Sequence, residues 1–120
     1  MIKIEHITSD IYGALNQVEA VGGRVFPIVA NEGTSFPFIV FDRSNIAITS
    51  TKDGYADIQA MFNARIVSAT YFEGLQILDN VIEQLERMQS SHGLTYHATL
   101  QGAYEERTED GFIQTITFTV

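Results

Sequence analysis

The first part of the chain carries a helical pattern of apolar residues between Ser9 and Glu19. Three side chains fall on one face at that spacing: Ile11, Leu15 and Val18. One of three polar residues is expected to cap the start of the helix: Thr8, Ser9 or Asp10. Gly22 and Gly23 supply the residue type that commonly ends helices. We therefore predict a short N-terminal helix.

The pattern of the next part of the chain is typical of β-strands, with two apolar runs separated by a polar loop. The runs are Arg24–Val29 and Phe36–Phe41. Each run contains one proline, whose missing N–H favours a strand start or the edge of a sheet. β-branched residues in Asp42–Thr51 indicate that the second strand continues or bends there, and Lys52–Tyr55 is typical of a turn.

A third strand and the strongest helix follow. Side chains alternate in character along Asp57–Ala69, which favours a half-buried strand over the competing helical interpretation. Thr70 and Glu73 have the spacing of a capping box, in which each side chain bonds a free backbone N–H of the other residue. The apolar stripe of the helix is Leu75, Leu78, Ile82 and Leu85, flanked by Val81 and Met88. Ser90–Gly93 is expected to end the helix.

The chain closes with two apolar segments, Leu94–Ala103 and Gly111–Val120, around the turn Thr108–Gly111. An Asp-Gly pair in that turn is typical of a hairpin. The element order predicts a single α+β domain over residues 1–120. We expect a mixed or antiparallel sheet of about four to five strands, packed against one long helix, with a short N-terminal helix.

Composition narrows the classes of partner. A formal net charge of −8 disfavours nucleic-acid binding and anionic membrane surfaces. The absence of cysteine excludes disulfides, thiolate metal sites and cysteine nucleophiles. Charged residues interrupt the apolar ones in Met1–Thr8, so we expect no signal peptide, and no apolar run has membrane-spanning length. A cytoplasmic product is the simplest expectation.

No motif for catalysis, metal binding or cofactor binding is present. The three histidines, His6, His92 and His97, lack metal-ligand spacing, and no glycine pair stands in a phosphate-binding motif. We therefore expect no enzyme, metal or cofactor. An enzyme of this sequence would have to use dispersed groups, with His97 and Glu105 as the first suspects.

An acidic cluster surrounds Arg107 near the closing hairpin. Its carboxylates belong to Glu105, Glu106, Glu109 and Asp110. Several oxygens close together suit a hard cation. The spacing of a calcium-binding loop is missing, however, and charged hairpin tips are commonly solvated. Solvation is the favoured interpretation.

Part of the sequence resembles a known protein family. The order of three features resembles the tail completion family of long-tailed phages and prophages, also described as head-to-tail joining or minor tail components. The features are Val21–Pro27, Phe36–Phe41 and a β-rich stretch that enters a long amphipathic helix. The resemblance covers about residues 10–120. Asp57–Ala69 departs from it by being longer and richer in alanine.

The resemblance implies a non-enzymatic structural protein that forms a homo-oligomeric ring, expected to be a hexamer. The ring would complete the tail tube at its head-proximal end and join it to the head connector. The tail-tube protein and the connector proteins are therefore the expected partners. The protein would be found in the cytoplasm of the bacterial host during assembly and then in the virion tail.

Candidate contact residues follow from these expectations, because proline-bearing strands suit sheet edges and subunit contacts. They are Arg24, Phe26, Pro27, Phe36, Phe38, Lys52 and Tyr55. The docking segment is expected to be a loop at Asn45–Tyr55. The acidic residues Glu105, Glu106 and Glu109 are candidates for facing a channel, where they would repel DNA, and their reversal to lysine should slow DNA ejection.

An alternative function keeps the same fold. Domains of this size and class often hold a small molecule between helix and sheet, and fold alone does not assign function. A small-molecule-binding regulatory module is therefore the second hypothesis. A ligand-dependent shift in melting temperature would favour it.

Overall fold

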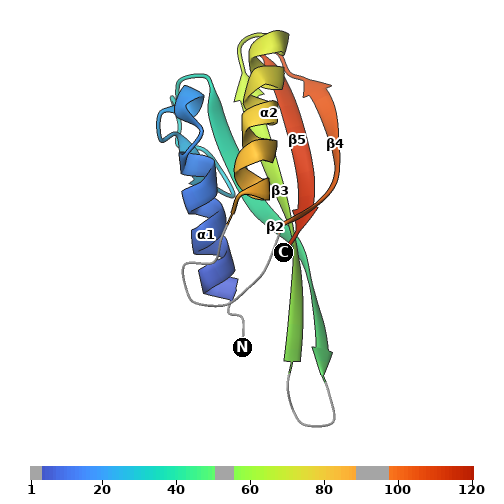
Figure 1. The fold of residues 1–120 in the computed structure, drawn as a ribbon. Helices are drawn as coiled ribbons and strands as arrows, with labels where there is room; N and C mark the ends of the chain where they lie inside the picture. Colours follow the sequence, from blue (N-terminus) through green and yellow to red (C-terminus); the bar gives the residue numbers. More distant parts are fainter. Residues whose placement is uncertain (1–3, 51–55, 89–97) are drawn as a thin grey trace.

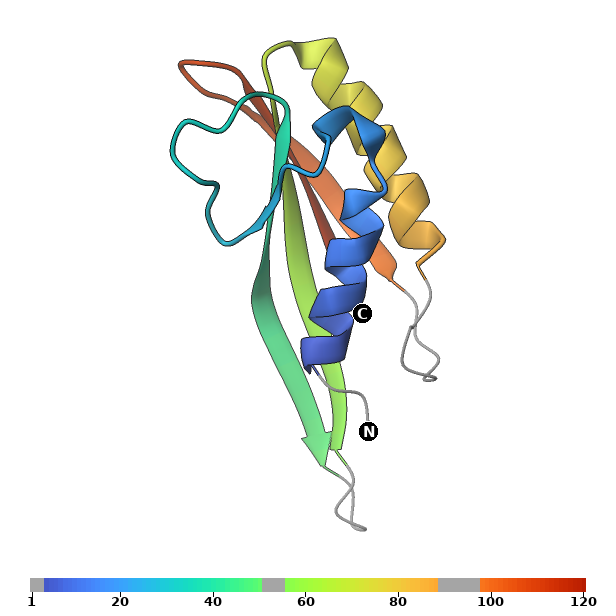
Figure 2. The same ribbon diagram turned by 90° about the vertical axis from the view of Figure 1, so that its left-hand side faces the viewer.

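The computed structural model describes residues 4–50, 56–88 and 98–120. Two helices pack on one face of a five-stranded sheet of order β1-β2-β3-β5-β4 (Figures 1 and 2). β1 pairs parallel to β2 and the other neighbours pair antiparallel, so the mixed α+β prediction is confirmed. The elements are α1 (Ile4–Asn16), the 3-10 turn η1 (Glu19–Val21), β1 (Val25–Pro27), β2 (Phe38–Ser50), β3 (Ala56–Ser68), α2 (Tyr71–Glu86), β4 (Thr99–Arg107) and β5 (Phe112–Thr119).

α1 begins and ends earlier than the predicted range of residues 9–19. Its buried face consists of Ile7, Ile11 and Leu15, spaced four residues apart. The prediction of a cap at residues 8–10 is wrong, because Thr8 lies inside the helix and its hydroxyl donates to the Ile4 carbonyl at 2.8 Å. The glycine pair ends η1 instead, where Gly22 adopts a left-handed φ of 55°.

The two prolines lie in an edge strand and before a strand start, where no backbone N–H is needed for the sheet. β1 is an edge strand and contains Pro27, while Pro37 precedes the start of β2. β1 is shorter than the predicted run because the chain leaves the strand at Ile28, which has a φ of 67°. The prediction of strand starts and edges is confirmed here.

β2 extends far past Phe41, so the docking loop predicted from Asn45 is wrong in its first half. Residues 45–50 pair with β3 down to Ser50 opposite Ala56. A β-bulge between Arg43 and Asn45 shifts the register by one residue, and the strand continues beyond it. The predicted turn at residues 52–55 lies outside the described residues. β3 confirms the strand interpretation of residues 57–69.

α2 begins as predicted, with the Thr70 hydroxyl accepting a hydrogen bond from the Glu73 N–H at 3.3 Å. Its buried face, however, is turned from the predicted stripe. The buried residues are Gly74, Ile77, Val81 and Leu85, while Leu78 and Ile82 pack at the margin of the core. At about 100° per residue the centre of the buried face lies roughly 80° from the predicted stripe. The predicted stripe contains only large side chains and therefore omits Gly74, which lies against the sheet.

The closing hairpin exists, but its first strand is displaced along the sequence. β4 runs to Arg107 instead of ending at Ala103, so Glu105 and Glu106 lie in a strand and not at the hairpin tip. Residues 94–97 lie outside the described residues. Nearly all of β4 is exposed at the edge of the sheet, and an edge strand tolerates charged side chains there.

The core lies between the helices and the covered face of the sheet. Phe62 of β3 and Phe118 of β5 stack at its centre, with ring centroids 5.8 Å apart. The other face of the sheet is more polar. There Arg65 and Asp42 form an ion pair, and the Thr117 hydroxyl donates to the Asn63 side chain at 2.9 Å.

Candidate interaction surfaces

The hairpin of β2 and β3 projects beyond the rest of the molecule (Figures 1 and 2). Pairing between β3 and β5 stops near Ala60, so among the described residues the segments 47–50 and 56–59 pair with each other and with no third strand. We call this two-stranded part the arm. An isolated two-stranded hairpin is marginally stable in water. The arm is therefore suited to being covered by another chain.

The arm carries an apolar side chain on the side where the helices lie. Ile46 packs against the core, and Ile48 lies two residues further along the same strand face. Ile48 is 65% exposed, because the core ends before it. The core-facing stripe of β2 thus continues into solvent.

The opposite end of β2 carries an aromatic patch, which we define as Phe26, Phe36 and Phe38. The Phe36 and Phe38 rings stack at 5.8 Å, and Phe26 lies edge-on to Phe38 at 6.4 Å. The parallel register pairs Phe26 with Val40, which places it on the face of the sheet away from the helices. Phe36 is 38% exposed. The structure thus brings three of the predicted contact residues together.

The other predicted contact residues have different positions. The Arg24 guanidinium donates from Nε to the Pro37 carbonyl at 2.9 Å, and the Arg24 carbonyl accepts from the Ile39 N–H at 2.9 Å. Arg24 therefore ties β1 to the start of β2 and supports the patch from within the chain. Pro27 is exposed at the sheet edge. Lys52 and Tyr55 lie outside the described residues.

The three predicted channel carboxylates do not share one surface. Glu105 and Glu106 are neighbours in β4, so their side chains point to opposite faces of the sheet, and Glu109 lies in the turn between β4 and β5. Glu105 lies on the side of the helices. One of its carboxylate oxygens accepts from the Tyr71 hydroxyl at 3.2 Å and the other from the Gln114 side-chain amide at 3.1 Å.

A small pocket surrounds the Glu105 carboxylate. Its volume is about 260 Å³, and it is lined by Tyr71, Glu105, Glu106, Arg107, Phe112 and Gln114. The hydrogen bond to Glu105 is the main cause that raises the pKa of the Tyr71 hydroxyl. Sequence reasoning missed this site, because Tyr71 and Glu105 are far apart in the chain and no spacing rule connects them.

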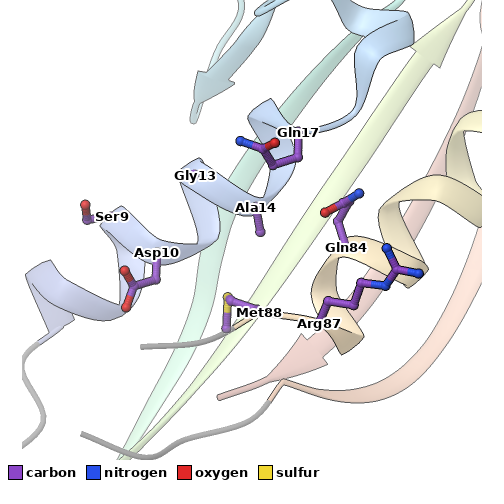
Figure 3. A pocket seen from close by; sticks show the side chains of 8 residues that line it. All are labelled: Ser9, Asp10, Gly13, Ala14, Gln17, Gln84, Arg87 and Met88. Atoms are coloured by element: carbon purple, nitrogen blue, oxygen red, sulfur yellow. The ribbon is translucent and has the colours of Figure 1, made fainter. Parts of the chain in front are cut away.

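A second hollow lies between the two helices. The small-molecule alternative expected a site between helix and sheet, which differs from this position. It is an open groove of about 450 Å³. Figure 3 shows residues of α1 and Gln17 just after it on one side, and Gln84 of α2 with Arg87 and Met88 just after that helix on the other. The α1 residues are Ser9, Asp10, Gly13 and Ala14. The space between α2 and the sheet is filled by buried side chains of the core.

Two classes of feature are missing from the described residues. Within residues 4–50, 56–88 and 98–120, no group of three or more histidine or acidic side chains is placed to hold a metal ion. No helix in the same part of the chain is long and apolar enough to cross a membrane. His6 lies in α1, while His92 and His97 fall outside the described residues.

Comparison with known proteins places the fold. No protein-family model matches the sequence, and no curated protein matches it. Among solved structures, a chain of the "Virion of native gene transfer agent (GTA) particle" is similar, with a TM-score of 0.76. The match covers 96% of this chain and 92% of that chain at 17% sequence identity. At this identity the likeness shows that the two chains share a fold.

Proposed function

We propose that this protein is a structural component of a phage-like particle. The observation that carries the proposal is the likeness to a virion chain over nearly the whole length of both chains. The residue pattern of Val21–Pro27 and Phe36–Phe41, which resembles tail completion proteins, supports the same class from the sequence.

Within that class, we propose that the protein assembles as a homo-oligomeric ring at the head-proximal end of the tail tube and joins it to the head connector. The arm and the aromatic patch support assembly by contact between unlike surfaces. From Phe38 to Ile48 the β2 strand spans roughly 33 Å, at about 3.3 Å per residue. Two apolar surfaces so far apart cannot cover each other within one chain.

They can cover each other between copies. If the arm of one copy lies on the patch of the next, each copy uses two different surfaces, and such contacts close into a ring when the rotation between copies allows it. The tail-tube protein and the connector proteins would then contact the two rims of the ring. An acidic chain also suits a position through which DNA passes without being held.

The proposal is tested in the particle itself. Deleting the gene should leave heads filled with DNA and tail tubes that fail to join, which electron microscopy of the lysate would show. Complementation with the intact chain should restore joined particles that contain it, as mass spectrometry of purified particles would detect. Joined particles in the deletion strain, or purified particles without the chain, would overturn the proposal.

A further inference from the structure

We propose that the pocket formed by Tyr71, Glu105, Phe112 and Gln114 accepts an arginine side chain of a protein partner. The pocket lies at the start of α2 and beside the β4–β5 hairpin, at the end of the molecule opposite the arm (Figure 1). It is therefore separate from the arm. The inference concerns the isolated chain and does not require the proposed function to hold.

The first argument is the preorganised carboxylate. Glu105 receives one hydrogen bond on each oxygen, from the Tyr71 hydroxyl at 3.2 Å and from the Gln114 amide at 3.1 Å. Both donors are neutral, so they fix the orientation of the carboxylate without compensating its charge. Each oxygen keeps a second lone pair for a further donor. Arg65–Asp42 and Arg87–Glu83 are ion pairs in the described part of the chain, and neither involves Glu105.

The second argument is the aromatic wall beside the carboxylate. The Tyr71 and Phe112 rings lie 5.8 Å apart at 73°, so one presents its edge to the other. Phe72 continues this wall at 5.6 Å from Tyr71 and is 75% exposed. Ring faces attract cations within about 6 Å of the centroid. Tyrosine and arginine are also among the side chains that contribute most binding energy in protein interfaces.

Size and charge select the occupant. A pocket of about 260 Å³ is smaller than most drug-sized ligand sites and suits one long side chain. Glu105 points to this side of the sheet and Glu106 to the other, so the negative charge in the pocket is that of the Glu105 carboxylate. Among the described residues this carboxylate forms no ion pair with Arg107, and its charge favours a cation. A planar guanidinium can stack on an aromatic ring while donating two N–H bonds to one carboxylate, and a lysine ammonium cannot do both in this way.

The experiment uses the purified chain and L-argininamide as the probe, followed by backbone and side-chain NMR at constant ionic strength. Saturable shifts are expected at Tyr71, Glu105 and Gln114. Citrullinamide has nearly the same shape without the charge and should cause no saturable shift at these residues. Lysinamide should bind several-fold more weakly, because it lacks the planar fork.

Paired variants separate the pocket from the general charge of the protein. Glu105→Gln should weaken L-argininamide binding by about threefold, the range expected for loss of an exposed ion pair. Glu109→Gln removes the same charge in the neighbouring turn and should leave binding unchanged. Equal shifts with citrullinamide, equal binding of lysinamide, or no effect of Glu105→Gln would each overturn the assignment. The comparison of probes on the unaltered chain remains decisive if a variant is unstable.

Discussion

Three small residues determine how closely the end of β3 packs against its neighbours. Ser68 is fully buried, and its hydroxyl donates to the Thr70 carbonyl at 2.8 Å. A Cβ added at Gly74 would lie 2.7 Å from the Ser68 hydroxyl oxygen, and one at Gly111 would lie 2.2 Å from the Ser68 carbonyl oxygen. Glycine is therefore required at position 111 because the backbones of Gly111 and Ser68 approach each other closely. The two central residues of the turn are Glu109 and Asp110.

Replacing Gly111 by alanine should destabilise the fold. The added methyl group meets a backbone oxygen that cannot rotate away, so β5 or the end of β3 must shift. A cost of about 1–3 kcal/mol is expected for such overpacking. The matched control is Gly13→Ala in α1, where the added Cβ meets nothing within 4 Å and should stabilise the helix by about 1 kcal/mol. Urea denaturation of the two variants should give changes of opposite sign, and changes of the same sign would contradict the structure.

The Tyr71–Glu105 hydrogen bond predicts a pH dependence at alkaline pH. The bond to the carboxylate, with smaller contributions from burial and charge, raises the pKa of Tyr71 above its ordinary value of 10.0. Because the folded state holds this proton more tightly, the bond stabilises the fold below the ordinary pKa, and the stabilisation is lost as pH rises through the pKa of folded Tyr71.

Ultraviolet absorbance measures this titration. The difference between the native chain and Tyr71→Phe isolates one tyrosine among five. Its midpoint should lie above 10.0 in the native chain and move down in a Glu105→Gln background. A Glu109→Gln background should leave it in place. A midpoint that Glu105→Gln does not move would show that the hydrogen bond is not formed in solution.

At the scale of elements, the sequence predicted the strands and helices better than their faces. Along β2 the core residues Ile39 and Phe41 have odd numbers, whereas Ile46 and Ile48 have even ones. Strict alternation would put these pairs on opposite faces. The bulge between Arg43 and Asn45 adds one residue and returns both pairs to the same face. A switch of the apolar residues from odd to even positions thus indicates one long strand with a bulge between the two runs.

The candidate surfaces were predictable to different degrees. Prolines at a strand edge and a strand start led to the aromatic patch, because the missing N–H restricts where such strands can lie. The Glu105 pocket depends on which residues of α2, β4 and β5 meet. That arrangement follows from tertiary packing, and no local pattern near Tyr71, Glu105 or Phe112 encodes it.

The arm should be required for assembly and not for folding. Ile48→Glu places a charge on the exposed apolar side of the arm, where burial against a second copy would be strongly opposed. Size-exclusion chromatography with light scattering should then show loss of the ring-sized species, while the melting temperature stays near that of the native chain. Gln59→Glu adds a charge to the exposed residue paired with Ala47, on the opposite side of the arm, and serves as the control.

Two results would contradict this role of the arm. The first is a ring-sized species that survives Ile48→Glu. The second is equal loss of the ring with Gln59→Glu, which would point to general charge repulsion between acidic copies. A Phe36→Ser change in the aromatic patch should reproduce the Ile48→Glu result, because the patch is the proposed seat of the arm.

For the whole molecule, the helices determine which face of the sheet can line a channel. α1 and α2 cover one face of the sheet and leave the other uncovered (Figure 2). The uncovered face carries Asp42, Arg65 and Thr117. Glu106 points to this free face and Glu105 to the side of the helices. The predicted repulsion of DNA by channel carboxylates can therefore involve Glu106 and not Glu105.

Single charge reversals test this division. Glu106→Lys should slow DNA ejection from assembled particles, because a lysine on the channel wall attracts the phosphate backbone that the carboxylate repels. Glu105→Lys changes the net charge equally but on the side of the helices, so ejection should keep its native rate. Raising the salt concentration should restore the Glu106→Lys rate, since screening weakens both attraction and repulsion. Native kinetics for Glu106→Lys, or equal slowing by both reversals, would show that the free face of the sheet does not line the path of the DNA.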